Sequence, residues 1–357
     1  MRLSFASAPA TDSSTAKDAA QGAFQAPNDV RVAMVVEQMW QPVPGGSGTY
    51  ITNLAHSLRA QGVKVAGIAA RRSHNDPGSS AVGLETMPVR YANLPRPALY
   101  ESWNRLHSPL AEAILPASDL VHATTWAIPP TRKPLVVTVH DLAFLRNPEH
   151  FTKRGNSYFR KSLQRTIKEA QAVIVPSQAT ADDCYEAGID SERVHVIPHG
   201  VSVQEVSASQ IDLFRTAYGL SRPYVLWTGT REPRKNLPGL LHAFSRIAGE
   251  FPQLDLVLVG PSGWGDDAVE RQLIQAIGTS RVHVLGHLAQ DTLQQAYAGA
   301  RAFVFPSYWE GFGLPVLEAM AHSVPVVTSL GTSTAEVAAD CGILVEPSDP
   351  DQIAAGL

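Results

Sequence analysis

The residues best suited to chemistry lie in the stretch 310–318, EGFGLPVLE, which follows an apolar run and opens a helical pattern. Its glycines let the backbone approach a ligand, and Pro315 suits the first position of a helix. Free N–H groups and the positive end of the helix dipole would then point at an anion. We expect Glu318 in the first helical turn, accepting hydrogen bonds from neighbouring hydroxyls such as those of a ribose. Glu310 is expected in the loop, nearer a cleft.

A second polar stretch, 229–236 with the sequence GTREPRKN, also follows an apolar run. Its three cations, Arg231, Arg234 and Lys235, would stabilise a departing diphosphate without a metal ion. The alternative is a solvated basic turn in which Asn236 caps the next helix. Acidic residues near a helix N-terminus are likewise favourable for structural reasons alone. The two stretches together favour a phosphate site.

Short, continuously apolar runs predict buried parallel strands, and the runs alternate with helical patterns. In the first half they lie at 30–36, 63–69, 120–123, 135–139, 172–175 and 194–197, with a helix over 49–61. In the second half they lie at 224–228, 254–259, 282–285, 302–305, 325–328 and 343–345, with helices over 237–251 and 291–300. This alternation predicts doubly wound sheets with helices on both faces.

We therefore predict an α/β protein of two Rossmann-like domains, which suits a length of 357 residues. The N-terminal domain is assigned to residues 30–203 and the C-terminal domain to 204–357. Residues 1–29, polar and without apolar periodicity, predict a disordered tail. Two such domains in tandem leave a cleft at the carboxyl ends of their strands, where open α/β sheets bind ligands.

Composition excludes several classes of function. Lys and Arg number 29 against 33 Asp and Glu, so there is no excess of positive charge for a nucleic-acid backbone. The two cysteines, Cys184 and Cys341, form neither a metal-ligand spacing nor a disulfide framework. No apolar run approaches the roughly 20 residues that cross a bilayer. We expect a cytoplasmic protein.

Both polar stretches resemble the retaining GT-B glycosyltransferases of family 4, whose signature is a pair of glutamates separated by seven residues. The resemblance continues through the segments PGGSG at 44–48, VHDL at 139–142, VPS at 175–177, IPHGV at 197–201 and VLG at 284–286. It covers residues 30–349, with the motifs in the family's order. The fold that the resemblance implies is GT-B, two Rossmann-like domains facing a central cleft.

The resemblance also implies roles for individual residues. Lys235, with Arg231 or Arg234, would grip the donor diphosphate, and Glu318 would bind the ribose. Glu310 and His140 would lie beside the transferred sugar, so that His140, Glu310 and Lys235 are the expected catalytic residues. Further donor contacts are expected from Gly45, Gly46, Gly311, Phe312, Gly313 and Leu314, and Asp141 is a candidate on the acceptor side.

Family 4 members act with retention of anomeric configuration, and the resemblance implies that neither a metal nor another cofactor is needed. The expected co-substrate is a nucleoside-diphosphate sugar. GDP-mannose comes first, by likeness to bacterial mannosyl- and rhamnosyltransferases of polysaccharide assembly. UDP-glucose, UDP-N-acetylglucosamine and dTDP-rhamnose stay open, because the base would be recognised through backbone groups near residues 286–288.

The acceptor is expected to be a glycan or a lipid-linked saccharide, bound by the N-terminal loops at 71–105. A predicted helix after His140 carries basic residues that could touch anionic lipid at the inner face of a membrane. An ordinary solvated helix face is the alternative. These basic residues are Lys153, Arg154, Arg160, Lys161, Arg165 and Lys168.

Other functions of the same fold are a nucleotide-sugar epimerase, a sugar phosphorylase, for which no pyridoxal-phosphate lysine can be identified, and a non-catalytic nucleotide-sugar sensor. The sequence departs from the family pattern at Thr230, where an arginine is frequent, at Ser323, where glycine is common, and at 334–337, where TAEV replaces LPEV. We expect the last two to be peripheral to the phosphate site. Residues 349–357 predict the start of a helix, and the helix that crosses back in GT-B proteins is expected to be missing.

Overall fold

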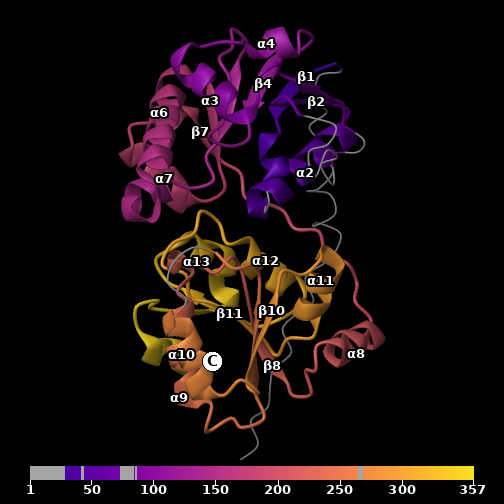
Figure 1. The fold of residues 1–357 in the computed structure, drawn as a ribbon, viewed down its shortest axis with the longest axis vertical. Helices are drawn as coiled ribbons and strands as arrows, with labels where there is room; N and C mark the ends of the chain where they lie inside the picture. Colours follow the sequence, from indigo (N-terminus) through magenta and orange to yellow (C-terminus); the bar gives the residue numbers. More distant parts are fainter. Residues whose placement is uncertain (1–28, 42–43, 73–83, 85–86, 264–267) are drawn as a thin grey trace, which may run out of the picture.

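The computed structural model describes residues 29–357 except 42–43, 73–83, 85–86 and 264–267. These residues form two domains, each built on one parallel sheet (Figure 1). In Figure 1 the N-terminal domain is mostly indigo to magenta, and the C-terminal domain below it runs from rose through orange to yellow. The predicted two-domain α/β architecture is confirmed. Except for Asp29, the tail predicted over residues 1–29 lies outside the described residues.

The N-terminal sheet has the strand order β3-β2-β1-β4-β5-β6-β7, and all of its neighbouring strands are parallel. The chain therefore reverses its direction of winding between β1 and β4, which are neighbours in the sheet. The strands are β1 (Arg31–Val35), β2 (Lys64–Ala69), β3 (Val89–Tyr91), β4 (Leu120–Ala123), β5 (Leu135–Thr138), β6 (Ala172–Val175) and β7 (Val194–Val196).

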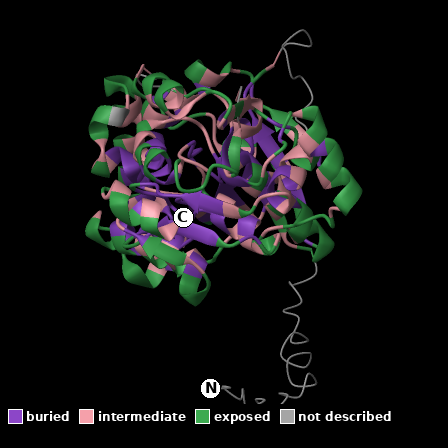
Figure 2. Ribbon diagram, turned by 90° about the horizontal axis from the view of Figure 1, so that it is seen from below, coloured by how far each residue is buried: buried purple, intermediate pink, exposed green. Residues whose placement is uncertain are grey.

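Helices cover both faces of this sheet, because successive side chains of a strand point to opposite sides. Met34 of β1 packs in one core with Ile51, whereas the next residue, Val35, packs in a second core with Trp103 and Leu163. Figure 2 shows the buried strands inside and exposed helix faces outside. The helices are α2 (Gly45–Ala60), α3 (Arg96–Arg105), α4 (Ala111–Ile114), α5 (Ala143–Arg146), α6 (Lys153–Glu169) and α7 (Gln178–Glu186), with short 3-10 turns η1 (Glu37–Trp40), η2 (Pro148–His150) and η3 (Ser191–Arg193).

The C-terminal sheet has the order β10-β9-β8-β11-β12-β13, again parallel, with its reversal between β8 and β11. Its strands are β8 (Tyr224–Thr228), β9 (Asp255–Val259), β10 (Val282–Gly286), β11 (Ala302–Phe305), β12 (Val326–Ser329) and β13 (Ile343–Val345). Its helices are α8 (Ala208–Ala217), α9 (Leu237–Ile247), α10 (Ala268–Ile277), α11 (Gln290–Ala298), α12 (Leu314–Ala321), α13 (Ser333–Ala338) and α14 (Pro350–Gly356), with η4 (Pro233–Lys235) and η5 (Ala339–Cys341). The last helix, α14, packs against α9 and β13.

Two of the differences from the sequence prediction have a clear physical reason. Strand β3 was not predicted, because it is a three-residue edge strand with two exposed side chains and carries little apolar signal. Helix α2 begins at Gly45 rather than at residue 49. Glycine has a low helix propensity, but a Cβ at Gly48 would lie 2.4 Å from the Pro44 side chain, so close packing of this turn requires glycine.

Across the described residues, no helix is both long and apolar enough to pass through a lipid bilayer.

The backbone conformation at Ser323 explains why glycine is common at this position in the family. Ser323 ends α12 with a φ of 60°, in the left-handed region, and its N–H donates to the carbonyl of Met320. An L-residue pays about 1–2 kcal/mol in this region, whereas glycine enters it freely. The side chain of Ser323 is exposed.

We therefore expect Ser323→Gly to raise the free energy of unfolding by about 1 kcal/mol, since the strain is removed and no buried contact is lost. Urea unfolding of the purified chain measures the change. Ser323→Ala is the control, because alanine keeps the strained backbone and should give no gain. A glycine variant less stable than the natural chain would contradict this explanation.

Candidate functional site

The two polar stretches meet at the reversal point of the C-terminal sheet. Strands β8 and β11 are neighbours in this sheet, and the loops that leave their carboxyl ends carry Lys235 and Glu310. Doubly wound sheets bind ligands at such a point, because adjacent loops diverge there and leave a crevice. Lys235 and Glu310 are far apart in the sequence, and it is the strand order of the sheet that brings their loops together.

Glu310 is buried between two cations. Its Oε1 accepts from Nζ of Lys235 at 2.6 Å, and its Oε2 lies 2.7 Å from Nη1 of Arg234. Glu310 and Lys235 are only 6% and 7% exposed. Burial works to raise the pKa of Glu310, but the charges of Arg234 and Lys235 outweigh it and lower that pKa to about 2. The carboxylate is therefore ionised at neutral pH and holds both cations in place.

The structure separates the two arginines that the sequence left as alternatives. Arg234 lies against Glu310 and also donates from Nη1 to the carbonyl of Trp309 at 3.1 Å. Arg231 instead donates from Nη2 to Oγ of Ser262 at 2.5 Å, where it lines a separate cavity of about 530 Å³. Of the two, Arg234 is placed beside Glu310. The cap predicted for Asn236 is present: its Oδ1 accepts from the N–H of Gly239 at 3.2 Å.

Glu318 lies in the second turn of α12, because the helix begins at Leu314. The prediction of the first turn was wrong by one residue, because the helix begins at Leu314 and Pro315 occupies its second position rather than its first. Burial raises the pKa of Glu318, and a hydrogen bond from the hydroxyl of Tyr297 to its Oε2, at 2.8 Å, opposes that shift. Tyr297 was not identified as a site residue, because α11 carries another buried polar side chain, Gln294, three residues earlier and the tyrosine does not stand out in its sequence.

Gly311 forms the joint between the domains. A Cβ at Gly311 would lie 1.8 Å from the carbonyl oxygen of His140, so this approach requires glycine. The carbonyl of Gly311 accepts from Oγ of Ser177 at 2.7 Å and from Oγ1 of Thr180 at 3.0 Å. The loop after β11 is thus tied to the N-terminus of α7 in the other domain.

Two more contacts join the two domains in the same region. Both carboxylate oxygens of Glu336 accept from N–H groups at the start of α7, those of Gln178 and Ala179, each at 2.7 Å. The guanidinium of Arg146, from α5, stacks over the ring of Trp309 with its Cζ 3.7 Å from the centroid. A carboxylate at a helix N-terminus and a cation over an indole are both attractive contacts.

The segment 334–337 is not peripheral, as the sequence had suggested. A Cβ at Gly313, whose φ is 98°, would lie 2.7 Å from Cγ2 of Thr334. Oγ of Ser333 donates to the carbonyl of Glu310 at 2.7 Å. Helix α13 therefore supports the loop that carries Glu310 and Gly313.

His140 faces this loop from the N-terminal domain. Its Nε2 lies 2.9 Å from the carbonyl of Thr124, and since a carbonyl only accepts, Nε2 carries the hydrogen and Nδ1 is free to accept. Its ring packs on Tyr50 and His199, with centroids 5.0 and 5.8 Å away. His199 in turn meets Phe312 at 5.0 Å.

Burial keeps these histidine rings neutral. It lowers the pKa of His140 and, as the larger of two causes, lowers the pKa of His199 to about 4; the second cause is repulsion between the protonated forms of His199 and His140. His199 and Tyr50 were not named as site residues. His199 lies in the family motif at 197–201, which was the available signal, whereas nothing in the sequence around Tyr50 predicts its position.

The remaining candidates lie at the edge of the site. Gly46 approaches the first residue of α12, since a Cβ there would lie 3.5 Å from Cδ1 of Leu314, and Gly45 has a φ of 62°. Oδ1 of Asp141 accepts from the N–H of Ala143 at 3.0 Å and so supports the start of α5. Among the described residues, no group of three or more His, Cys, Asp or Glu is arranged to hold a metal ion.

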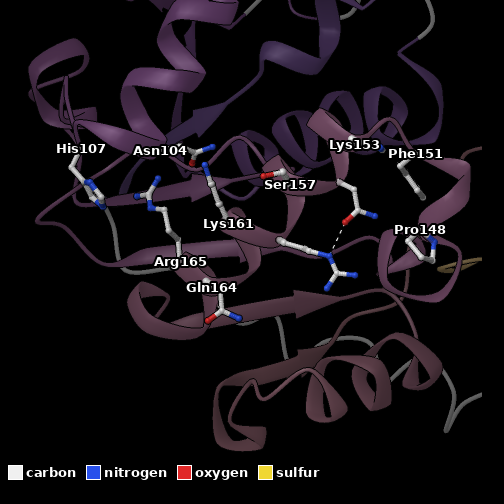
Figure 3. A pocket seen from close by; sticks show the side chains of 11 residues that line it. Asn104, His107, Pro148, Phe151, Lys153, Ser157, Lys161, Gln164 and Arg165 are labelled. Carbon is white, nitrogen blue, oxygen red and sulfur yellow. Dashed lines mark hydrogen bonds between the residues drawn. The ribbon is translucent and has the colours of Figure 1, made fainter.

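A second feature of the N-terminal domain is a groove along α6, shown in Figure 3, with a volume of about 790 Å³. We call it the α6 groove. Its lining includes the exposed cations Lys153, Arg160 and Lys161. The inclusion of Arg165 in a solvated basic face was wrong, because Arg165 is 7% exposed and its Nη1 donates to the carbonyl of Ile128 at 2.6 Å.

Comparison with known proteins decides the family. Residues 44–205 match the family model described as Glycosyltransferase Family 4, and residues 222–357 match that of Glycosyl transferases group 1. The O-antigen chain mannosyltransferase B of Escherichia coli is 32% identical over 267 residues, which are 73% of this chain and 70% of that protein. The chain belongs to glycosyltransferase family 4.

Two further similarities agree with this family 4 assignment. The serotype-specific mannosyltransferase WbdA of Escherichia coli is 33% identical over 61% of this chain, a match that spans 28% of that longer protein. The crystal structure of HepE from Anabaena, in complex with UDP and glucose, superposes with a TM-score of 0.70 at 23% identity, over 91% of this chain and 88% of that one. The protein is a glycosyltransferase with a GT-B fold, and these findings favour glycosyl transfer over the epimerase, phosphorylase and sensor alternatives.

The contact between the two domains of this glycosyltransferase can be tested by a substitution at Gly311. We expect Gly311→Ala to push the domains apart, because a methyl group has no room against the His140 carbonyl and overpacking costs about 1–3 kcal/mol. Small-angle scattering should show a larger radius of gyration, and glycosyl transfer should fall at least tenfold.

Gly249→Ala is the matched control, since a Cβ at Gly249 would meet nothing within 4 Å. It should change neither the radius of gyration nor the rate. A Gly311→Ala protein with natural dimensions and activity would show that the contact is dispensable.

Proposed function

We propose that this glycosyltransferase moves a hexosyl unit, with retention of configuration, from a nucleoside-diphosphate sugar to a hydroxyl of a glycan or lipid-linked saccharide. The observation that carries the proposal is the pairing of Lys235 and Arg234 with Glu310, at the reversal point of one sheet and opposite His140 of the other domain. Two cations paired with Glu310, in the loop that precedes α12, match a leaving diphosphate.

In the proposed reaction, the bond between the anomeric carbon and the β-phosphate oxygen breaks, and its electron pair leaves with the diphosphate. The acceptor oxygen bonds to the anomeric carbon on the same face, and its proton passes to the departing phosphate oxygen. Lys235 and Arg234 would stabilise the charge that develops on the diphosphate, so neither a metal nor another cofactor is required. The Nδ1 of His140 would accept a hydroxyl hydrogen of the sugar, and Glu310 would stabilise the oxocarbenium-like centre.

GDP-mannose is the proposed donor, with mannose supported by the mannosyltransferases of Escherichia coli that this chain resembles. Sugars carried by UDP are the alternative donors, because the structurally similar HepE binds UDP and glucose. Glu318 would bind the ribose, and the base would lie near residues 286–288. Gly46, which approaches Leu314, would close the N-terminal domain over the diphosphate.

The acceptor would enter from the N-terminal domain, where Asp141 is a candidate contact. The α6 groove offers cations to an anionic headgroup, which suits a lipid-linked acceptor and a peripheral position at the inner face of a membrane. Exposed cations near an anionic surface contribute about 1 kcal/mol each.

Calorimetric titration with UDP, GDP, dTDP and their hexose conjugates tests the donor site, in the natural chain and in Glu318→Ala and Lys235→Ala. We expect one nucleoside diphosphate to bind, with affinity reduced at least tenfold in both variants because each removes a charged contact. The melting temperature is recorded for each protein to show that it is folded. Absence of binding to a folded chain, or equal affinity in all three proteins, would overturn the donor assignment.

Vesicle sedimentation tests the membrane contact. We expect binding to vesicles with phosphatidylglycerol, but not to phosphatidylcholine alone, and a loss of binding as salt rises. The double variant Arg160→Ala/Lys161→Ala should weaken it about tenfold. The control is Arg132→Ala/Lys133→Ala, which removes two exposed cations elsewhere on the same domain. Equal effects of the two double variants would contradict a role for the α6 groove.

A further inference from the structure

The position of Glu318 is controlled by a short chain of buried hydroxyls. The hydroxyl of Tyr297 lies 2.8 Å from Oε2 of Glu318 and 2.8 Å from Oγ1 of Thr228. Tyr297 is fully buried, and Thr228 is 4% exposed. A carboxylate only accepts, so the single hydrogen of Tyr297 points to Glu318, and Thr228 must donate to Tyr297. Both hydrogens are thus directed toward the carboxylate.

The ring of Tyr297 has little freedom to move. It packs on Phe303, with centroids 5.5 Å apart, and stacks on His322 at 6.0 Å with an interplanar angle of 9°. His322 is bonded through Nε2 to Oε1 of Gln294 at 2.5 Å. Burial, then the negative charge of Glu318, raise the pKa of Tyr297, so the phenol keeps its proton and remains a donor.

The hydrogen-bonded series Thr228–Tyr297–Glu318 also connects the two polar stretches. Thr228 is the last residue of β8 and directly precedes the loop of Lys235, whereas Glu318 lies in α12 behind the glycine loop. Tyr297 comes from α11, which neither stretch includes. Resting on the proposed function, in which Glu318 binds the ribose of the donor, we infer that Tyr297, oriented by Thr228, is a positioning residue that sets the preference of this site for ribonucleotides over 2′-deoxyribonucleotides.

The physical reason is that a carboxylate discriminates a hydroxyl only while it is ionised and correctly oriented. Each carboxylate oxygen has more than one acceptor position, so Glu318 can hold Tyr297 and still accept from ribose hydroxyls. Without the Tyr297 hydroxyl, the carboxylate can rotate, and its bonds to the 2′ and 3′ hydroxyls lose their geometry. A bond to the 2′ hydroxyl is absent for a deoxyribonucleotide in any case, so deoxyribonucleotide affinity should change less.

The hydroxyl of Tyr297 also sets the pH range over which the ribonucleotide binds. Burial raises the pKa of Glu318 and the Tyr297 bond lowers it, so losing that bond raises it further. Because the ionised form accepts the ribose hydroxyls, binding is retained above this pKa and lost as pH falls through it. His322, the titratable group stacked on Tyr297, bonds to Gln294 rather than to Glu318, and its contribution stays common to all the variants below.

The experiment is calorimetric titration of the full chain with UDP and dUDP, and with GDP and dGDP, between pH 5 and 8. We expect the natural chain to prefer the ribonucleotide about tenfold, as one well-placed hydrogen bond allows. In Tyr297→Phe the ribonucleotide should bind about tenfold more weakly, the preference should shrink toward unity, and the acid loss of binding should move to higher pH.

Tyr224→Phe is the matched control. Tyr224 is also fully buried in the same domain core, but its hydroxyl donates to the carbonyl of Ala296 at 2.7 Å and does not contact Glu318. This variant should lose some stability while keeping the ribonucleotide preference and the pH midpoint. If Tyr297→Phe does not fold, Thr228→Val decides the question, and it should show the same changes to a smaller extent.

The outcomes separate the two proposals. If Glu318→Ala abolishes the ribonucleotide preference while Tyr297→Phe and Thr228→Val keep it, Glu318 acts alone and the role of Tyr297 is refuted. If the natural chain shows no dependence on the 2′ hydroxyl, or if Glu318→Ala keeps the ribonucleotide preference of the natural chain, the ribose assignment of Glu318 fails, and the inference fails with it. If Tyr224→Phe reproduces every change, the effect reflects lost core stability and Tyr297 has no positioning role.

Discussion

A carboxylate buried between two cations is the interaction on which the rest of the site depends. Removing charged groups from water costs several kcal/mol for each ion, and this cost is recovered only when the geometry is close and the neighbouring polar groups are bonded. Here Glu310 meets Lys235 at 2.6 Å and Arg234 at 2.7 Å. Main-chain contacts complete the arrangement, because Ser333 bonds the carbonyl of Glu310 and Arg234 bonds that of Trp309. Arg234 also pairs with Glu232 at 2.8 Å. The arrangement of charges thus exists before any ligand arrives, with both cations already held in place.

The same loop ties the two domains together. Gly311 follows Glu310 directly and leaves no space for a side chain against His140, while its carbonyl receives two hydroxyls from the start of α7. Movement between the domains therefore displaces the residues next to the ion pair. Domain closure in such enzymes completes the catalytic arrangement and excludes water, and in this chain the closing contacts and the proposed donor contacts share one loop.

The two sides of the site differ in their electrostatics. The C-terminal side carries fixed charges, whereas the N-terminal side presents His140, His199 and Tyr50, whose rings pack on one another. Burial lowers the pKa values of both histidines, so they add no positive charge near neutral pH. A ligand with a charged diphosphate and a neutral sugar matches this division, with the diphosphate toward Lys235 and the sugar toward His140.

The sequence by itself determined the fold class, the strands of both sheets except β3, and most of the residues that the structure brings together at this site. Buried parallel strands are continuous apolar runs and glycine loops have a fixed order of residues, and both patterns are local. Tertiary structure decided what local patterns cannot encode. It placed Arg234 rather than Arg231 beside Glu310, brought segment 334–337 to the loop, and buried Arg165. It also joined Tyr297 to Glu318, because contacts between residues far apart in the chain depend on strand order and packing, which no single segment specifies.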